Sequence, residues 1–180
     1  MGGESNVVFF DLETQRDFNE VGGRSHIRRM GLSVAVTYST ATGQFRHYTE
    51  ANVAELVKEL QEADLVVGYN ILNFDYEVLR GYTDAPLAQR PTVDLLMHLY
   101  QRLGFRVALD NVAEATLGEG KTADGLQAIR WWREGKIGEL LAYCQQDVEV
   151  TRKLYEFGRR HKYVQYRDRN FRVQRVLVNW

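Results

Sequence analysis

The feature of this sequence that most constrains its fold is a short apolar run that ends in two acidic residues. The residues from Val7 to Phe10 are all apolar, and Asp11-Leu12-Glu13-Thr14 follows directly. An apolar run of this length predicts a buried β-strand, in which residues two apart project from the same face. Asp11 and Glu13 are therefore expected side by side. Paired carboxylates suit hard divalent ions such as Mg²⁺ and Mn²⁺, although many strands simply end in a polar turn.

Length and cysteine content narrow the class of protein. With 180 residues, the sequence predicts a single domain over 1–180 that buries about 70% of its unfolded surface. Cys144 is the only cysteine, which excludes a disulfide framework within the chain and favours a reducing, cytoplasmic compartment. The first residues carry no basic segment and the apolar run after them is short, so we expect neither a signal peptide nor a membrane partner.

Charge is distributed unevenly along the chain. Residues 151–180 hold nine Lys and Arg against two Asp and Glu, although the whole chain has a net charge of −1. A basic segment beside an acidic body suits a polyanion whose phosphates approach a metal site. A solvated charged surface is the plainer interpretation. The charge pattern alone therefore does not establish that the partner is a nucleic acid.

The periodicity predicts an α/β fold in which strands come first and helices follow. Strands are predicted over 7–12, 31–38, 44–49 and 64–68, and helices over 51–62, 74–82, 94–103 and about 137–159, with further helical segments from 109 onward. Pro86 and Pro91 predict a loop between two of the helices. The segments 163–167 and 171–180 predict a terminal hairpin around Arg169-Asn170. Together these elements predict a central mixed β-sheet flanked by helices, with a C-terminal β-hairpin.

Other acidic residues join Asp11 and Glu13 in a candidate catalytic set. Asp75 follows a predicted strand where a helix begins, and a first-turn helix acid is the simpler interpretation. Asp147 lies in the long late helix, and Tyr143 precedes it by four residues and so shares its face. The ordered pattern is D-x-E at Asp11 and Glu13, then N-x₄-D at Asn70 and Asp75, then Y-x₃-D at Tyr143 and Asp147.

This ordered pattern resembles the DEDD superfamily of ribonuclease-H-like 3′–5′ exonucleases over nearly the whole chain. The tyrosine subclass is the better match, because Ala142 stands where the histidine subclass would place its histidine. A narrower likeness is to a bacterial family of predicted exonuclease domains that stand alone or accompany DEAD/DEAH-type helicases. The segments that carry this likeness are 11–15, 20–23, 70–75, 121–126, 131–132 and 143–144.

The resemblance implies a ribonuclease-H-like fold and cleavage of phosphodiester bonds from a 3′ end with two Mg²⁺ or Mn²⁺ ions. The metal ligands that it implies are Asp11, Glu13, Asp75 and Asp147, with Tyr143 as a phenol that orients the attacking water. The residues that it implies near the substrate are Leu12 through its backbone, Thr14, Asn70 and Lys121. For Asn70 a structural hydrogen-bonding role is an equal alternative, and for Lys121 a surface position is the plainer interpretation. We expect single-stranded DNA as the first choice of substrate. RNA is the second, because the sequence identifies no residue that would recognise the 2′-hydroxyl group.

Alternatives to an exonuclease also follow from the sequence. A non-catalytic nucleic-acid-binding module that works with a helicase would keep the fold without turnover. An NTPase is suggested by a loose phosphate-loop pattern over 115–122, but such a loop follows a buried strand, and 109–117 has a helical period.

Two further segments leave their roles open. Trp131 and Trp132, flanked by arginines, are candidates for stacking on a base or for core packing. The glycine-bearing segment 15–29 either guides substrate or is plain surface.

Overall fold

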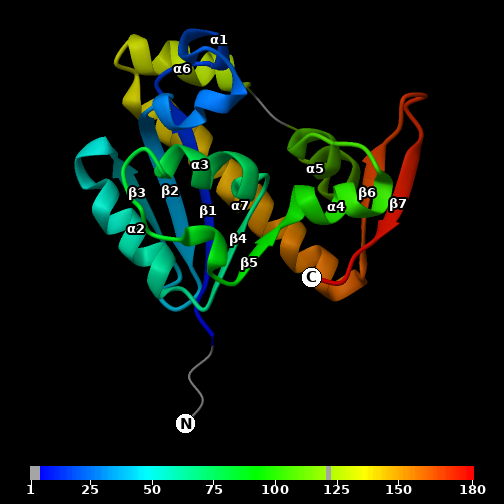
Figure 1. Ribbon diagram of the computed structural model, residues 1–180. Coiled ribbons are helices and arrows are strands. Elements are labelled where there is room, and N and C mark those ends of the chain that lie inside the picture. The colour runs from blue at the N-terminus through cyan, green and yellow to red at the C-terminus, as the bar shows by residue number, and fades with distance from the viewer. Residues whose placement is uncertain (1–4, 121–122) are drawn as a thin grey trace.

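The computed structural model describes residues 5–120 and 123–180, and its centre is a five-stranded sheet in the order β3-β2-β1-β4-β5 (Figure 1). The strands are β1 (Val7–Thr14), β2 (Leu32–Ser39), β3 (Gln44–Thr49), β4 (Leu65–Gly68) and β5 (Thr92–Asp94). β2 is antiparallel to both of its neighbours, whereas β1, β4 and β5 run parallel to one another. The predicted mixed sheet is therefore confirmed, and β1 is its central strand.

Helices cover both faces of this sheet. They are α1 (Phe18–Val21), α2 (Val53–Glu62), α3 (Tyr76–Leu79), α4 (Leu95–Leu103), α5 (Leu109–Leu117), α6 (Gly125–Arg133) and α7 (Ile137–His161). Alternation along β1 separates two cores, because Phe9 packs with residues of α7 while Val8 and Phe10 pack with residues of α2. The acidic end of β1 thus emerges from a strand that is buried on both faces.

Short turns of 3₁₀- or π-helix connect several of these elements. They are η1 (Arg24–Arg29), η2 (Glu50–Asn52), η3 (Ile71–Asp75) and η4 (Leu87–Gln89). α1 and η1 lie in the segment 15–29, for which the sequence left two alternatives: guiding substrate or forming plain surface. They lie together with α6 at one end of the sheet (Figure 1), and Glu20 of α1 pairs with Arg133 of α6.

The C-terminal hairpin forms a second, separate sheet from β6 (Tyr163–Arg167) and β7 (Val173–Leu177) (Figure 1). The hairpin is fixed to α5, since the Thr116 hydroxyl accepts the Gln165 N–H at 2.8 Å. The chain then returns to α7, where the Trp180 indole N–H donates to the Tyr155 carbonyl at 3.0 Å. The predicted hairpin is confirmed.

One predicted helix was wrong in extent, and one strand of the sheet was not predicted. The segment predicted as a helix over 74–82 is the end of the π-turn η3 followed by one turn of α3, and the chain passes close to η1 just after α3 ends. A Cβ on Gly81 would lie 2.4 Å from the Arg28 carbonyl oxygen. β5 was not predicted, since a three-residue strand is too short to show a periodicity.

The described residues 109–120 of the phosphate-loop region do not form the strand that such a loop needs. The residues before it form helix α5, which ends at a left-handed Gly118. Among the described residues, none of the helices has both the length and the apolar character that crossing a bilayer requires.

Candidate active site

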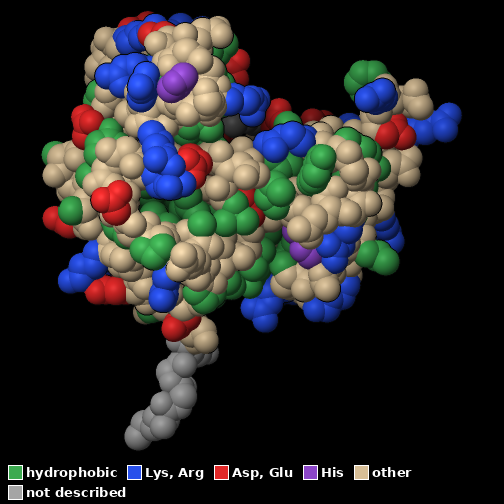
Figure 2. Space-filling model, in the orientation of Figure 1, with side chains coloured by type: hydrophobic (Ala, Val, Ile, Leu, Met, Phe, Trp, Pro, Cys, Tyr) green, Lys and Arg blue, Asp and Glu red, His purple; other side chains and the backbone are tan. Residues whose placement is uncertain are grey.

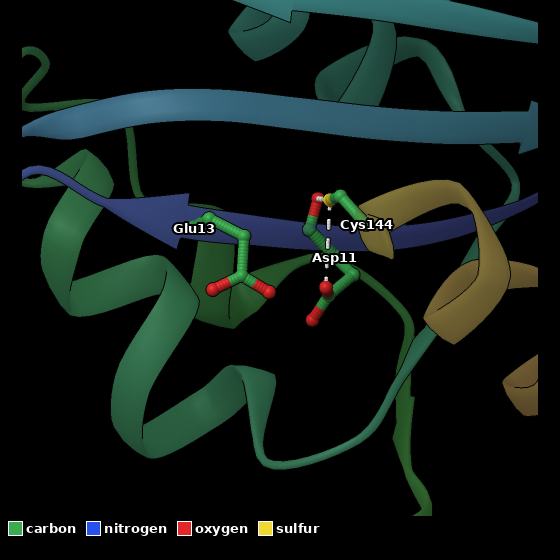
Figure 3. Close-up of side chains that lie close together, drawn as sticks. All are labelled: Asp11, Glu13 and Cys144. Atoms are coloured by element: carbon green, nitrogen blue, oxygen red, sulfur yellow. Dashed lines mark hydrogen bonds between the residues drawn. The ribbon is translucent and has the colours of Figure 1, made fainter. Parts of the chain in front are cut away.

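Asp11 and Glu13 project from the same side of β1 beside Cys144 of α7 (Figure 3). One carboxylate oxygen of each acid and the Cys144 sulfur all lie within 4.8 Å of one another. The alternation of side chains along a strand explains why the two acids are neighbours. The side-by-side arrangement expected from the sequence is therefore present.

Cys144 contributes a thiol to this cluster that the sequence did not assign to it. Its Sγ donates to the Asp11 backbone oxygen at 3.4 Å and lies 3.5 Å from Asp11 Oδ2. Burial raises the pKa of this fully buried thiol, and the negative charges of Asp11 and Glu13 raise it further. The thiol therefore stays protonated and acts as a donor to Asp11. One feature of the sequence could have identified Cys144: it lies three residues before Asp147 on a predicted helix and therefore near the same face.

Asp75 reaches β1 from the turn that follows β4. β4 pairs with β1 only as far as Phe9 and Val67, so β1 extends beyond its neighbour. The Asp75 Oδ1 accepts the Leu12 N–H there at 3.1 Å, and the side chain is only 2% exposed. Asp75 is the N-cap residue of α3, where the helix-acid interpretation places it, but its side chain makes no capping hydrogen bond to that helix. Burial and then the negative charge of Asp11 raise the pKa of the Asp75 carboxyl well above its usual range.

The turn that carries Asp75 is organised by Asp94, a residue that the sequence analysis missed. The two Asp94 carboxylate oxygens accept the N–H groups of Asn70 at 2.8 Å and Leu72 at 3.0 Å. Asn70 has a left-handed backbone with a φ of 66°, which asparagine tolerates better than most residues. Its side-chain oxygen accepts from Arg106 at 3.0 Å. The left-handed backbone of Asn70 and its hydrogen bond with Arg106 favour the structural role for this residue.

Tyr143 and Asp147 lie on the buried face of α7. The Tyr143 ring contacts Trp131 of α6 edge-on, with ring centroids 5.9 Å apart. Burial raises the pKa of Tyr143 far above its usual value, and the negative charges of Glu13, Asp147 and Asp11 add to this. The phenol thus faces the acids of β1 and α7 and keeps its proton at neutral pH.

The other residues expected near the substrate take part in the framework or lie outside the described residues. The Leu12 N–H is already donated to Asp75, and the buried Thr14 hydroxyl donates to the Arg16 carbonyl at 2.9 Å. Lys121 lies outside the described residues. Trp131 and Trp132 are both partly buried against the core, which favours the packing interpretation of the pair.

The donor chemistry of this site fits a hard divalent ion. Among the described residues, the ligand atoms that lie within 4.8 Å of one another belong to Asp11, Glu13 and Cys144, and Asp75 and Asp147 are not part of that group. The carboxylate oxygens of Asp11 and Glu13 are the kind of ligand that Mg²⁺ and Mn²⁺ prefer. The thiol of Cys144 lies in the same group and donates to Asp11.

Comparisons with known proteins agree with this fold. The family model described as RNase_H superfamily matches residues 8–157. The structure of the family B DNA polymerase from the hyperthermophilic archaeon Pyrobaculum calidifontis superposes with a TM-score of 0.66 at 19% identity. That match covers 87% of this chain but only 25% of the polymerase, and it supports the fold alone. No curated protein matches the sequence. On the strength of the family match, the chain belongs to the RNase H superfamily.

Proposed function

We propose that the chain is a metal-dependent 3′–5′ exonuclease that acts on single-stranded nucleic acid, with DNA preferred over RNA. The observation that supports this proposal most is the convergence of Asp11, Glu13 and Tyr143, which come from the central strand and the longest helix. Phosphodiester cleavage needs groups that hold cations and a group that positions water, and this cluster offers both.

The proposal includes two ions of Mg²⁺ or Mn²⁺, whose chemistry when bound would be activation of water and stabilisation of negative charge on the departing 3′ oxygen. Asp11, Glu13 and Asp147 would hold one ion. Asp11 and Asp75 would hold the other, with Asp75 acting directly or through water. The hydrogen bond from the Leu12 N–H fixes the position of the Asp75 carboxyl group beside β1.

Tyr143 would orient the attacking water through its hydroxyl group. Because its pKa is raised by burial and by the surrounding acids, the phenol donates and accepts hydrogen bonds and does not abstract the proton. Contact with Trp131 holds the ring. Loss of the hydroxyl should therefore slow turnover more than it weakens substrate binding.

The tyrosine subclass, the 3′–5′ direction and an association with a helicase are parts of the proposal that rest on the sequence pattern. The order of Asp11, Glu13, Asp75, Tyr143 and Asp147 along the chain is the support for them. A single catalytic domain over 1–180 is part of the same proposal.

The test is degradation of a short single-stranded DNA with Mn²⁺ or Mg²⁺, using one sample labelled at the 5′ end and one at the 3′ end. The 5′-labelled strand should give a ladder that shortens with time, and the 3′-labelled strand should release labelled mononucleotide first. A circular single strand should persist, because it has no end. Asp11→Asn should abolish degradation, while a matched RNA strand compares the two substrates.

Other outcomes would replace this proposal. A wild-type protein that binds the strand and leaves it intact with either metal would be a non-catalytic binding module. Cleavage of the circular strand would indicate an endonuclease. Loss of ATP with intact nucleic acid would indicate an NTPase.

A further inference from the structure

A surface hollow of about 610 Å³ lies between the α4–α5 connection and the C-terminal hairpin. The residues of its lining that matter here are Phe105, Arg106, Tyr166, Arg167 and Arg169. The hairpin side lies beyond residues 8–157, which the family model matches. This hollow is therefore formed in part by an element outside the matched region.

Hydrogen bonds hold the two walls of the hollow in place. Asn111 of α5 pairs with the backbone of Arg167, accepting its N–H at 2.8 Å and donating to its carbonyl at 3.0 Å. The Tyr69 hydroxyl donates to the Val107 carbonyl at 2.6 Å on the opposite wall. The rings of Phe105 and Tyr166 meet edge-on across the hollow, 5.8 Å apart. The shape is thus set before any ligand binds.

The chemistry of the hollow is basic and aromatic. Phe105 remains 46% exposed, which leaves ring surface for a base to stack on. Arg169 is exposed and makes no hydrogen bond or ion pair within the part of the chain that the structure describes. Asp168 is the acidic residue of the lining, and its carboxylate accepts the N–H groups of Asn170 and Arg172 within the turn. Arginine beside exposed aromatic rings matches the phosphates and bases of a single strand.

The tip of the hairpin extends this surface. Phe171 is 83% exposed and has a left-handed backbone with a φ of 59°, which is unfavourable for a bulky residue. Folding alone does not require an exposed aromatic ring at a strained position, so a ligand is the simpler reason for it. Figure 2 shows hydrophobic and Lys/Arg side chains together at this projecting tip.

The hollow adjoins the turn that carries Asp75. Arg106 lines the hollow and donates to the side-chain oxygen of Asn70 at 3.0 Å. Asn70 begins the turn that ends at Asp75. The free tip of the hairpin and the acidic end of β1 also lie toward the same side of the molecule (Figure 1).

We propose that this hollow binds the nucleotides upstream of the 3′ end of a single-stranded nucleic acid, with Phe105 stacking on a base and Arg106 and Arg169 contacting phosphates. The inference rests on the proposed function for the identity of the 3′ end. It adds a substrate-binding surface on the hairpin, so a strand long enough to reach the hollow should bind more tightly than a shorter one.

The test uses the double variant Phe105→Ala/Arg169→Ala, and Arg160→Ala as the control. Arg160 is an exposed arginine of α7 that does not line the hollow. Binding of a fluorescent single strand is measured in an Asp11→Asn background, which keeps the strand intact. The double variant should weaken binding of a long strand by about tenfold or more. Arg169→Ala alone should lower the salt dependence of binding by about one released ion. With Asp11 intact, hydrolysis of a dinucleotide, which is too short to reach the hollow, should be the same in the double variant and in Arg160→Ala as in the wild-type protein.

The proposal would be overturned if the double variant bound a long strand as tightly as the parent, for instance because the hollow docks a protein. Equal weakening by Arg160→Ala would also overturn it, since general charge would then be the cause. A loss of dinucleotide hydrolysis would show damage to the catalytic site and not a separate upstream surface. If the wild-type protein degraded no strand, the proposed function would fail, while the binding comparison would still decide the role of the hollow.

Discussion

The Asp75 carboxylate accepts the backbone N–H of Leu12 at 3.1 Å, so one side chain completes the edge of the central strand and also borders the acidic cluster. The N–H lies where β1 continues beyond its pairing with β4. A buried N–H without a partner costs about 1–3 kcal/mol. Asp75 therefore has a structural task and a candidate catalytic task that substitutions can separate.

Asp75→Asn should separate these tasks, because the amide oxygen still accepts from Leu12 while the negative charge is lost. We expect the free energy of unfolding to stay within about 1 kcal/mol of wild type or to rise, since a buried ionisable group beside Asp11 is removed. Nuclease activity should fall by about 100-fold or more. Asp75→Ala should lose the same activity and also about 1–3 kcal/mol of stability. Urea unfolding without divalent metal checks this, and equal stability of the two variants would contradict it.

Tyr143→Phe should lower kcat by about 10- to 100-fold and leave KM nearly unchanged, because the hydroxyl orients water and the ring keeps its contact with Trp131. Steady-state degradation of a labelled strand gives both constants. Tyr100→Phe is the control, since Tyr100 is an exposed residue of α4. A rise in KM with unchanged kcat would instead assign Tyr143 to substrate binding.

Cys144 provides a test of the ligand chemistry of the site. Because the thiol is fully buried, a thiol reagent should modify it only after unfolding. Cys144→Ala should cost about 1–2 kcal/mol by removing a buried group, and activity with Mg²⁺ or Mn²⁺ should persist. A loss of metal-dependent activity in a folded Cys144→Ala protein would contradict this and show that the site needs the sulfur, either as a ligand or as the donor to Asp11.

Local sequence pattern was sufficient for the main elements of the fold. The apolar run before Asp11 and the helical period of α7 depend on neighbours in sequence, so β1 and α7 were predicted within a few residues. The side-by-side position of Asp11 and Glu13 follows from strand geometry alone. Those parts of the candidate site needed no knowledge of the tertiary structure.

The parts that sequence did not predict depend on contacts between distant segments. β5 is three residues long and exists because it pairs with β4. The π-turn before α3 is held by Asp94, whose role requires the positions of both strands. The burial of Asp75 against Leu12 likewise depends on where β4 ends. Such features lie outside any window of local periodicity.

Gly158→Ala should destabilise the protein by about 1–3 kcal/mol, because a Cβ there would lie 2.6 Å from the Trp180 indole ring. The clash would displace the chain end that follows the hairpin. Gly138→Ala on the same helix is the control, since nothing lies within 4 Å of its Cβ position. That variant should be neutral or more stable by up to about 1 kcal/mol. Thermal unfolding of the two variants would contradict this if Gly138→Ala were as harmful as Gly158→Ala.

His98 should make stability depend on pH through its contact with Trp180, whose ring lies 4.9 Å away. Its Nε2 is buried with no hydrogen-bond partner among the described residues, and burial, followed by the charge of Arg102, lowers the pKa of His98 to about 4. Between pH about 6.5 and about 4 the unfolded chain binds a proton that the folded protein does not, so stability falls as pH falls through this window. The ring is only partly buried, which limits the effect to about 1–2 kcal/mol.

Replacing the imidazole isolates this contribution from that of the carboxyl groups. His98→Phe keeps an aromatic ring against Trp180 and has no group that titrates, so its stability should fall less than that of wild type between pH about 6.5 and about 4. The measurement is urea unfolding at several pH values. Gln101→Ala, a change at an exposed residue of α4 that does not ionise, should keep the wild-type slope across the window. Identical slopes for wild type and His98→Phe would show that protonation of His98 does not oppose folding.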